Sequence, residues 1–273
     1  MQSTINAPIF SEFPTRATMV RLFTADRLND PMFPIPTVSV VVPARNEAEN
    51  LRHVLPRIPQ WVDEIILVDG HSSDATIEVA RSIYPNIRVL KQTGRGKGNA
   101  LREGFAAANG DIIVMLDADG STDPAEIPAY VGALLSGADF AKGSRFLQGG
   151  GTSDMSVLRR LGNAGFVVIT RALFGGQYTD LCYGYNAFYA NAIHKLQLDG
   201  DGFEIETQMN LRALQAGLKV AEVPSFEADR IHGASNLRTF PDGWRVLKTI
   251  LKERLSGYYT KQSAPILKER IIS

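Results

Sequence analysis

The stretch "IIVMLDADGSTDP", residues 112–124, decides the fold. Its first five residues are apolar and predict a strand inside the protein, and the carboxylates of Asp117, Asp119 and Asp123 follow at once. Acids gathered at the end of a buried strand are costly unless a positive partner compensates them. The stretch therefore predicts an internal sheet whose strand end presents acidic side chains to a cation.

Short apolar runs of this kind alternate with helical patterns along the first half of the chain. Strands that are apolar throughout are covered on both faces, and alternation with helices indicates parallel, right-handed crossovers. The pattern predicts an α/β doubly wound domain, in which ligands bind beyond the carboxyl ends of the strands. Strands are expected at 38–42, 64–68, 87–90 and 111–116, and helices at 47–58, 73–84, 99–108 and 124–135. Pro56 should break the first helix and Asp74 should cap the second.

The pattern becomes less regular after residue 140. A glycine loop is expected at 148–151, helices at 154–174 and 203–216, and strands near 185–189 and at 219–224. We expect one catalytic domain at 37–240, preceded by a loosely ordered arm at 1–36 and followed by an amphipathic helix and tail at 241–273.

The composition, with 44% hydrophobic and 21% charged residues, is that of an ordinary globular protein. Basic and acidic residues number 29 each, so no basic excess indicates a nucleic-acid partner. The single cysteine, Cys182, excludes an intramolecular disulfide. The N-terminus has no secretory pattern, and the apolar run 161–176 contains Arg171 and falls short of a membrane span. We expect a protein of the cytoplasm, either soluble or peripheral at the inner face of the membrane.

Asp117 and Asp119 are the first candidates for chemistry. In an extended chain, residues two apart point to the same side at roughly 6–7 Å, so both carboxylates can converge on one divalent cation. Oxygen ligands in a partial protein cage suit Mg²⁺ or Mn²⁺ shared with substrate phosphates. In the alternative, Asp119, Ser121 and Asp123 only form a turn and cap the next helix, and this is our interpretation of Asp123.

The stretch "TGRGKGNA", residues 93–100, places three alternating glycines with Arg95 and Lys97 before a helix. Backbone N–H groups, a helix N-terminus and cationic side chains together form an anion site. The stretch is not a Walker loop, since Gly98 follows Lys97, and not G-x-G-x-x-G, since Asn99 replaces the third glycine. The alternative is a flexible surface turn.

Two further strand ends carry polar residues. Arg45, Asn46 and Glu47 follow the first strand, where a dinucleotide-binding domain would have its glycine fingerprint. A nucleotide would therefore be bound in a manner different from NAD. Asp69 ends the second strand and is a candidate for a base or ribose contact. Glu47 and Glu49 are also explained as first-turn acids that the helix dipole favours, which is our interpretation of Glu49.

These stretches together resemble the inverting glycosyltransferases of family 2, which have the GT-A fold. "VVPARNE" (41–47) is similar to the family's P-x-x-N-E, and "LVDGHSSDAT" (67–76) to its V-D-D/G-x-S-x-D-x-T. "GKGNALREGFAAANGDIIVMLDADGS" (96–121) matches its glycine loop, helix and D-x-D. Four motifs in order are highly specific. The resemblance implies a Rossmann-like, mostly parallel sheet flanked by helices in a single catalytic domain.

The second half resembles the dolichol-phosphate mannosyltransferase and glucosyltransferase branch. The resemblance extends over about residues 37 to 240. One departure lies in the motif G-F/Y-R-x-F, where this chain has "GYNAF" with Asn186 in place of the arginine. A donor or acceptor contact at that position is therefore open. The matching segments are 138–146, 178–188, 201–226 and 230–238.

The resemblance implies transfer of a sugar from a nucleotide-diphosphate donor to a polyprenyl phosphate. UDP-glucose, UDP-glucuronate and GDP-mannose all remain open as donors. A divalent ion at Asp117 and Asp119 would stabilise the departing diphosphate, which makes Asp119 a catalytic candidate. By resemblance, the donor nucleotide would be bound by Pro43, Arg45, Glu47, Asp69, Lys97, Asp117 and Ala118.

The nature of the acceptor decides which further groups are needed. A phosphate monoester is already anionic and needs positioning, for which "GSRF" (143–146) offers Ser144 and the bidentate grip of Arg145. A saccharide hydroxyl would require a carboxylate base. We take Arg145 and Glu206 as the catalytic candidates on this side. The carboxylates considered as a base are Asp180, Glu204 and Glu206, of which the last two also fit a helix start.

The segment 240–259 predicts an amphipathic helix with basic residues opposite its apolar face. Such a helix can lie on an anionic membrane surface, which would suit a lipid-linked acceptor. The alternative is a helix that packs its apolar face on the domain. The apolar face is expected to contain Trp244, Leu247, Ile250, Leu251 and Leu255.

Four functions compete. The first is metal-dependent, inverting transfer to a polyprenyl phosphate, and the second is transfer to a saccharide hydroxyl in polysaccharide or glycolipid assembly. The third is a nucleotide-sugar-binding regulator without turnover. A sugar nucleotidyltransferase is disfavoured, because no G-G-x-G-T-R-type loop follows the first strand.

Overall fold

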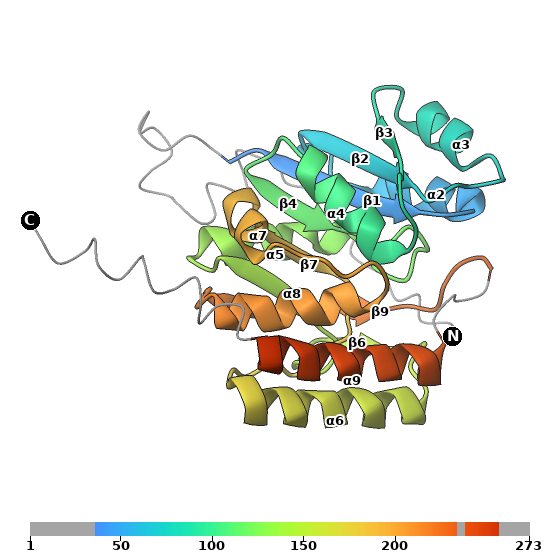
Figure 1. The fold of residues 1–273 in the computed structure, drawn as a ribbon. Helices are drawn as coiled ribbons and strands as arrows, with labels where there is room; N and C mark the ends of the chain where they lie inside the picture. The colour runs from blue at the N-terminus through green and yellow to red at the C-terminus, as the bar shows by residue number, and fades with distance from the viewer. Residues whose placement is uncertain (1–35, 234–237, 257–273) are drawn as a thin grey trace, which may run out of the picture.

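The computed structural model describes residues 36–233 and 238–256, so the predicted N-terminal arm lies outside the described residues except for Pro36. Its centre is a seven-stranded sheet in the order β3-β2-β1-β4-β7-β5-β8 (Figure 1). β7 runs antiparallel to its neighbours β4 and β5, and the other pairs are parallel. The strands are β1 (Val38–Ala44), β2 (Glu64–Asp69), β3 (Arg88–Lys91), β4 (Ile112–Met115), β5 (Phe140–Ser144), β7 (Asn186–Tyr189) and β8 (Val220–Pro224).

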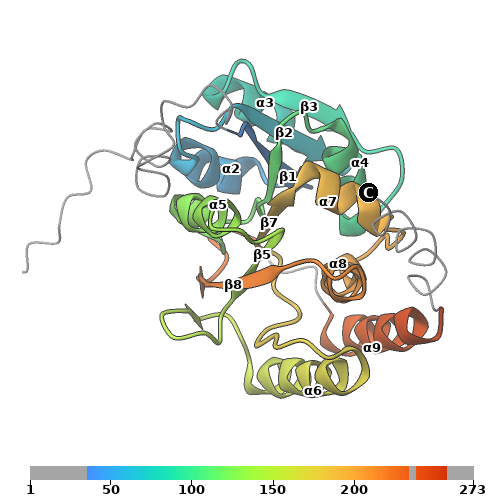
Figure 2. The same cartoon turned by 90° about the vertical axis from the view of Figure 1, so that its left-hand side faces the viewer.

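The all-apolar strands are covered on both faces, as their sequences predict. In β1, Val40 and Val42 pack in one apolar cluster while Val41 packs in another, and all three are fully buried. Alternate residues of a strand point to opposite faces, so such a strand needs a helix layer on each side. The two layers lie on either side of the sheet in Figure 2. One contains α2 (Ala48–Val54), α3 (Thr76–Ile83) and α5 (Ile127–Leu135), and the other α4 (Lys97–Ala107), α7 (Ala190–Leu196) and α8 (Glu204–Gln215).

Two long helices form a further layer outside α8. α6 (Val157–Phe174) and α9 (Thr239–Ser256) lie side by side there in both views. Arg212 of α8 and Glu253 of α9 are both buried and form an ion pair of 2.8 Å. The predicted division at residues 240 and 241 thus falls inside a helix that is fixed to the domain. None of the described helices is apolar over a length that would cross a bilayer.

The local helix boundaries follow from identifiable side chains. α2 ends at Val54, and a 3₁₀ turn, η1 (Leu55–Arg57), follows at Pro56. The Asp74 carboxylate accepts hydrogen bonds from the N–H of Thr76 at 3.1 Å and of Ala48 at 3.2 Å. It therefore joins the first turns of α3 and α2, and the N-cap position of α3 itself is held by Ala75.

Asp123 caps the helical turn that leads into α5. Its carboxylate accepts a hydrogen bond from the N–H of Ala125 at 2.9 Å, at the start of the 3₁₀ turn η2 (Pro124–Glu126). It also forms an ion pair with Arg57. The capping interpretation of Asp123 is confirmed.

Candidate functional site

Two cavities meet beyond the carboxyl ends of β1 and β4. The strand order reverses between these neighbours, and ligands of open α/β sheets bind at such a switch point. The strand-end cavity, of about 920 Å³, lies at the ends of β1 and β2 and the loop before α4. The groove, of about 490 Å³, runs toward α6 and α9. Both are lined by Lys97, Asp117, Asp119, Phe203 and Arg230.

A cation between two acids forms the floor where the cavities meet. Nζ of Lys97, the first residue of α4, lies 2.6 Å from Oδ1 of Asp117 and 2.7 Å from Oε1 of Glu206. Burial raises the pKa of both carboxyls, and the charge of Lys97 opposes the rise. Burial would lower the pKa of Lys97, but the two acids outweigh it and the pKa is raised. Lys97 is therefore a fixed positive charge at neutral pH.

Gly184, just before β7, lies against this cluster without a side chain in between. A Cβ at this position would lie 2.7 Å from Oε1 of Glu206 and 3.0 Å from both Oδ2 of Asp117 and Nζ of Lys97. A larger residue would therefore have to shift the charged ends of these side chains.

Asp119 is held by a turn contact and by a second cation. Its Oδ1 accepts hydrogen bonds from the N–H and hydroxyl of Ser121 at 3.0 and 2.7 Å, as in the capping alternative. Its Oδ2 lies 3.2 Å from Nη1 of Arg230, whose Nη2 pairs with Glu47. The backbone next to Arg230 also contacts the turn at Asp119, since the N–H of Ile231 donates to the carbonyl of Asp119 at 3.3 Å.

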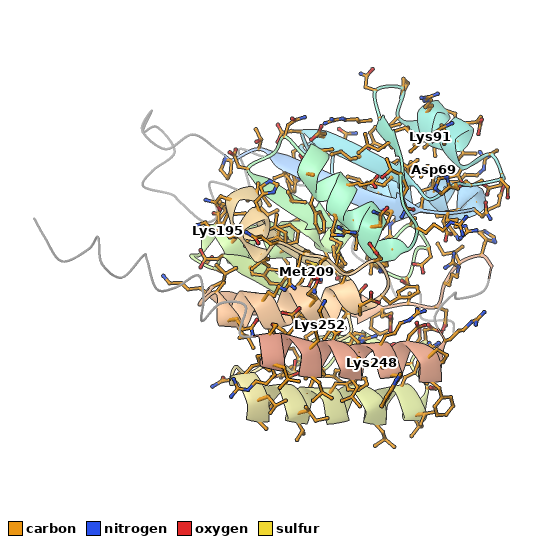
Figure 3. The ribbon with its side chains drawn as sticks, viewed as in Figure 1. Asp69, Lys91, Lys195, Met209, Lys248 and Lys252 are labelled. Carbon is orange, nitrogen blue, oxygen red and sulfur yellow. The ribbon has the colours of Figure 1, made fainter. Side chains whose placement is uncertain are left out.

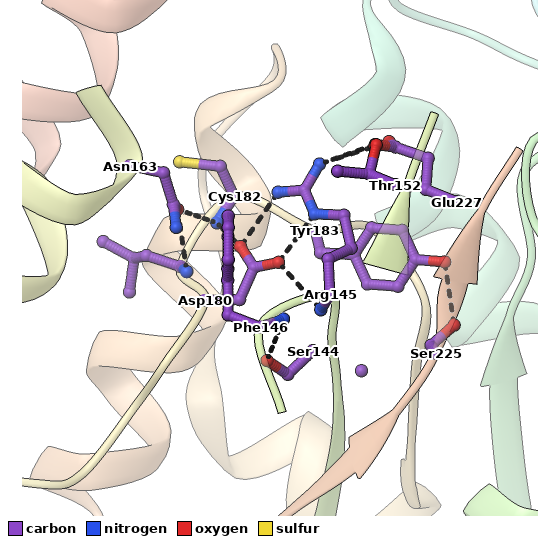
Figure 4. Close-up of polar contacts among 12 residues, drawn as sticks. Ser144, Arg145, Phe146, Thr152, Asn163, Asp180, Cys182, Tyr183, Ser225 and Glu227 are labelled. Carbon is purple, nitrogen blue, oxygen red and sulfur yellow. Dashed lines mark hydrogen bonds and ion pairs between the residues drawn. The ribbon is translucent and has the colours of Figure 1, made fainter. Parts of the chain in front are cut away.

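A third cation, Arg145, is almost wholly buried and pairs with two acids (Figure 4). It lies just after β5, and its Nε and Nη2 donate to the two oxygens of Asp180 at 2.7 and 2.9 Å. Its Nη1 donates to Glu227 at 3.0 Å, on the short strand β9 (Phe226–Glu227), which pairs with β6 (Gly151–Thr152). Burial alone would raise the pKa of Asp180, but the hydrogen bonds and charge of Arg145 lower it. Asp180 is therefore held as an anion in an ion pair with Arg145.

The donor set accommodates Mg²⁺ or Mn²⁺ in part. Asp117 and Asp119 are close enough for the charge of Asp119 to raise the pKa of Asp117. Each of the three cations bridges two carboxylates, so acids exceed cations in this network. Among the described residues, no group of three or more His, Cys, Asp or Glu side chains is arranged around a metal position. An ion would thus take its other ligands from substrate and water, as Mg²⁺ commonly does.

The groove changes from charged to apolar as it leaves the ion pairs. Its outer walls come from α6 and α9, which approach each other where Gly243 faces Phe166. Much of this apolar surface is open: Phe240 is 78% exposed and Trp244 58% exposed. The outer lining includes Leu158, Phe166, Phe240, Trp244 and Leu247.

α9 presents apolar residues on two faces. Its buried face is formed by Val246, Thr249, Ile250 and Glu253, so only Ile250 of the predicted apolar face is buried. Trp244, Leu251 and Leu255 are exposed. The helix therefore packs on the domain and also offers apolar surface outward.

The sequence profile of glycosyl transferase family 2 matches residues 39–196, from β1 to the end of α7. The chain belongs to glycosyl transferase family 2. A relative of this glycosyltransferase, the dolichol-phosphate mannosyltransferase of Pyrococcus furiosus, is 32% identical over 211 residues, which are 74% of this chain and 59% of the relative. The undecaprenyl-phosphate mannosyltransferase of Micrococcus luteus is 29% identical over 212 residues, 73% of this chain and 87% of the relative. The chain thus spans less than two thirds of the archaeal relative.

A solved structure agrees on the fold of this glycosyltransferase. Glucosyl-3-phosphoglycerate synthase from Mycobacterium tuberculosis, in complex with Mn²⁺, UDP and glucosyl-3-phosphoglycerate, gives a TM-score of 0.66 at 24% identity. The likeness covers 92% of this chain and 86% of that chain, and at this identity it concerns the fold alone. The predicted GT-A fold, with its mostly parallel sheet, and the predicted family are confirmed.

Most predicted donor residues of the glycosyltransferase gather in one place. Asp69 is the exception: it lies at the end of β2 (Figure 3), is 3% exposed, and accepts a hydrogen bond from the N–H of Ser72 at 3.3 Å. It supports the turn beside the cavity and does not line it. The donor roles stay predictions. The strand-end cavity is lined by the other six, Pro43, Arg45, Glu47, Lys97, Asp117 and Ala118.

The glycine loop is tied to the protein more firmly than its sequence predicts. The N–H groups of Gly98 and Asn99 donate to the carbonyl of Asp201 at 2.8 and 3.2 Å. These backbone donors of α4 are therefore used internally. The loop contributes Arg95 and Lys97 to the strand-end cavity as cations.

The residues predicted for the acceptor side have different surroundings in the structure. Ser144 is fully buried, lies 2.5 Å from the hydroxyl of Thr179, and does not line the groove, so it has no surface for a phosphate. Arg145 and Glu206 do line the groove. Glu204 accepts a hydrogen bond from the N–H of Gly202 at 2.9 Å and closes the turn before α8. The acceptor-phosphate role of Arg145 and the catalytic role of Glu206 stay predictions.

Sequence reasoning gave no role to several residues that the structure brings to the site. Arg230 lies within a segment that matches the family, and its cationic side chain was a recognisable candidate there. Glu227 and Gly184 matter through contacts with residues distant in the chain, and no local pattern indicates them.

Proposed function

We propose that this protein transfers a sugar from a nucleoside-diphosphate donor, UDP- or GDP-linked, to a polyprenyl phosphate, with inversion and with a divalent metal ion. The observation that carries the proposal is the two-part groove. Its floor is charged, at Asp117, Arg145 and Glu206, and its outer walls are apolar, at Phe240 and Trp244. A polyprenyl phosphate has the same two parts, a charged head and an apolar tail. The names of the Pyrococcus and Micrococcus relatives support the same class of acceptor.

The strand-end cavity is the proposed place of the donor nucleotide. It opens onto the groove at Lys97 and Arg230, so a diphosphate at this junction would face both cations. An ion held by Asp117 and Asp119 would neutralise charge on the leaving diphosphate. The UDP and Mn²⁺ named for the mycobacterial synthase support this pairing of nucleotide and metal.

The transfer needs little proton chemistry from the protein. An ionised oxygen of the acceptor phosphate attacks the anomeric carbon from the face opposite the diphosphate. The bond from sugar to donor phosphate breaks as the bond to the acceptor forms, and the configuration inverts. Lys97 stabilises the charge that develops on the leaving group. Arg145, at the groove side, orients the acceptor phosphate, and it can do so by exchanging Glu227 while keeping Asp180.

A saccharide hydroxyl acceptor is the second candidate, and Glu206 is the observation that favours it. Glu206 lines the groove, and burial raises the pKa of its carboxyl. A raised pKa brings a carboxylate closer to the working pH of a general base. To act in this way Glu206 would have to release Lys97.

We also propose that the outer ends of the groove contact the inner face of a membrane. Leu158 of α6 is 52% exposed and lines the groove together with the exposed Phe240 and Trp244 of α9. Basic residues flank this apolar surface, among them Lys248, whose ammonium lies 5.6 Å from the ring of Trp244. Apolar and basic side chains together suit an anionic lipid surface.

The deciding experiment incubates the protein with radiolabelled nucleotide sugars, Mn²⁺, and undecaprenyl or dolichyl phosphate. Under the proposal, label from one donor moves into the organic phase and is released by mild acid. Label that appears only on added saccharides supports the second candidate. Donor binding without turnover on any acceptor would leave the nucleotide-sugar-binding regulator. A panel of UDP and GDP sugars in the same assay identifies the donor.

A further inference from the structure

Lys142, on β5, has a buried amine that forms no ion pair with an acid of the described residues. Its side chain is fully buried, and within residues 36–233 and 238–256 no carboxylate forms an ion pair with it. Burial lowers the pKa of its ammonium, and the charge of Asp180 only partly opposes this. An ammonium taken out of water without an acid is costly. Its hydrogen bonds to two backbone carbonyls must therefore offset this cost.

The Lys142 ammonium replaces a missing donor in the sheet. In the β5–β7 ladder, the N–H of Gly143 donates to the carbonyl of Tyr185 at 2.9 Å. Antiparallel bonds recur at alternate residues, so the N–H of Arg145 should donate next to the carbonyl of Tyr183. It donates to Asp180 instead, at 3.3 Å. Nζ of Lys142 donates to the Tyr183 carbonyl at 3.0 Å and to the Gly143 carbonyl at 2.7 Å.

Where the strands separate, Tyr183 and Gly184 contact residues of the site. Gly184 lies against the Lys97 cluster, as described above. The ring of Tyr183 lines the groove and lies 4.8 Å from the guanidinium carbon of Arg145. Nζ of Lys142 lies 5.6 Å from the same ring. One ammonium thus fixes a segment that touches both halves of the site.

We propose that Lys142 is a positioning residue of the transfer reaction, which holds the Tyr183–Gly184 backbone between the Lys97 cluster and Arg145. It contacts neither substrate. Without its ammonium, two buried carbonyls lose their donor and the segment is free to move toward the ladder or toward the cluster. Movement toward the cluster would displace the Glu206 carboxylate by contact with Gly184, and movement toward the ladder would shift the Tyr183 ring relative to Arg145. The inference rests on the proposed function for its kinetic part.

Asn186 gives the same arrangement an independent support. It faces Lys142 in the ladder, is fully buried, and its Nδ2 lies 3.5 Å from the Tyr183 carbonyl. Its Oδ1 has no hydrogen-bond partner among the described residues. An arginine at this position would add a second buried cation beside Lys142. The buried positive charge is thus supplied from β5, and the neighbouring strand carries a neutral residue.

The test compares Lys142→Met with Lys142→Gln and with Ser39→Ala. Met keeps the volume and removes the donor, while Gln keeps one amide donor. Ser39 is an equally buried polar residue on β1, with hydrogen bonds to Glu64 and Gly110. We expect Lys142→Met to fold, to bind nucleoside diphosphate as the wild type does, and to lose about tenfold or more in kcat. Lys142→Gln should recover part of the loss, and Ser39→Ala should change stability without changing kcat.

Hydrogen exchange provides the readout that does not depend on the acceptor. Exchange at the amides of residues 182–186 should rise about tenfold or more in Lys142→Met and stay unchanged in Ser39→Ala. Wild-type kcat and wild-type exchange in Lys142→Met would overturn the inference. If Lys142→Met does not fold, full activity and unchanged exchange in Lys142→Gln would overturn it equally. Failure of the wild type to label a polyprenyl phosphate would count against the proposed function alone, since exchange still tests Lys142.

Discussion

Asp119 has two partners that a metal ion would have to share or replace. Ser121 holds one of its oxygens and Arg230 the other. Asp119 lines both cavities, so an ion that enters either of them can reach its carboxylate. Its importance should therefore be visible in metal binding and turnover.

Replacement of Asp119 by Asn should lower transfer by about 100-fold or more, because the carboxylate charge that attracts the metal ion is lost. Calorimetric titration with Mn²⁺ in the presence of nucleoside diphosphate should show weaker binding. Asp123→Asn is the matched control on the same turn. It removes the ion pair with Arg57 but keeps a capping oxygen, so it should change stability by about 1 kcal/mol or less and leave turnover intact. Full metal-dependent activity in Asp119→Asn would remove the metal site from this position.

Cys182 allows a pH prediction at the same scale. It lines the groove, and burial raises the pKa of its thiol from 9.0 to about 12. Below pH 9 the thiol is neutral in both folded and unfolded protein. As the pH rises from 9 toward 12 only the unfolded form ionises, so stability falls in that window.

A thiol reagent should consequently react slowly with native Cys182 at pH 8, with a rate that rises about tenfold per pH unit up to pH 11. The measurement is the rate of a chromogenic disulfide exchange, with unfolded protein as the reference. A rapid reaction at pH 7, equal to that of the unfolded chain, would contradict the raised pKa of the thiol.

At the scale of elements, the join between α8 and α9 is the most tightly specified contact of the outer layer. Glu253 is fully buried and accepts hydrogen bonds from Gln208 and from two nitrogens of Arg212. Removal of one member of a buried pair leaves the other charged and poorly solvated.

Glu253→Ala should therefore lower the free energy of unfolding by about 3 kcal/mol or more. The neighbouring Lys252, which is exposed and pairs with Asp199, provides the control. Lys252→Ala should change the free energy of unfolding by about 0.5 kcal/mol or less. Denaturant titration measures both, and equal effects would refute a special role of the buried pair.

Contacts between elements also determine which features could be predicted from the sequence alone. β1, β2 and β4 are predictable because an apolar run with polar ends is a local property, and Asp123 is predictable as a cap for the same reason. Lys142 acts where β5 and β7 separate, and that event depends on a pairing between residues more than forty positions apart. The burial of Ser144 and Asp69 was not predictable, because burial of a strand-end side chain depends on which loops cover it.

At the scale of the whole molecule, exposed apolar residues of α6 and α9, among them Leu158, Phe240 and Trp244, line the groove. Burial of a large apolar side chain contributes about 1.5–3 kcal/mol. Two such residues inserted into a lipid surface would change binding by about tenfold or more.

The Phe240→Ala, Trp244→Ala double variant should bind vesicles of anionic phospholipid at least about tenfold more weakly than the wild type. Val168→Ala is the control, since Val168 is 65% exposed but lies in the second half of α6 and does not line the groove. Sedimentation with vesicles at low and at physiological salt measures the binding. Unchanged affinity in the double variant would show that this surface is not the one that meets lipid.

Arg230 lines the strand-end cavity, the groove, and a smaller polar cavity of about 430 Å³ beside Arg45 and His232. One side chain thus forms part of the wall of three cavities. A ligand that moves the Arg230 side chain from within one cavity changes the volume of the other two. The apparent KM for each of the two substrates should accordingly depend on the concentration of the other. The kinetics should also depend on the order in which the substrates bind.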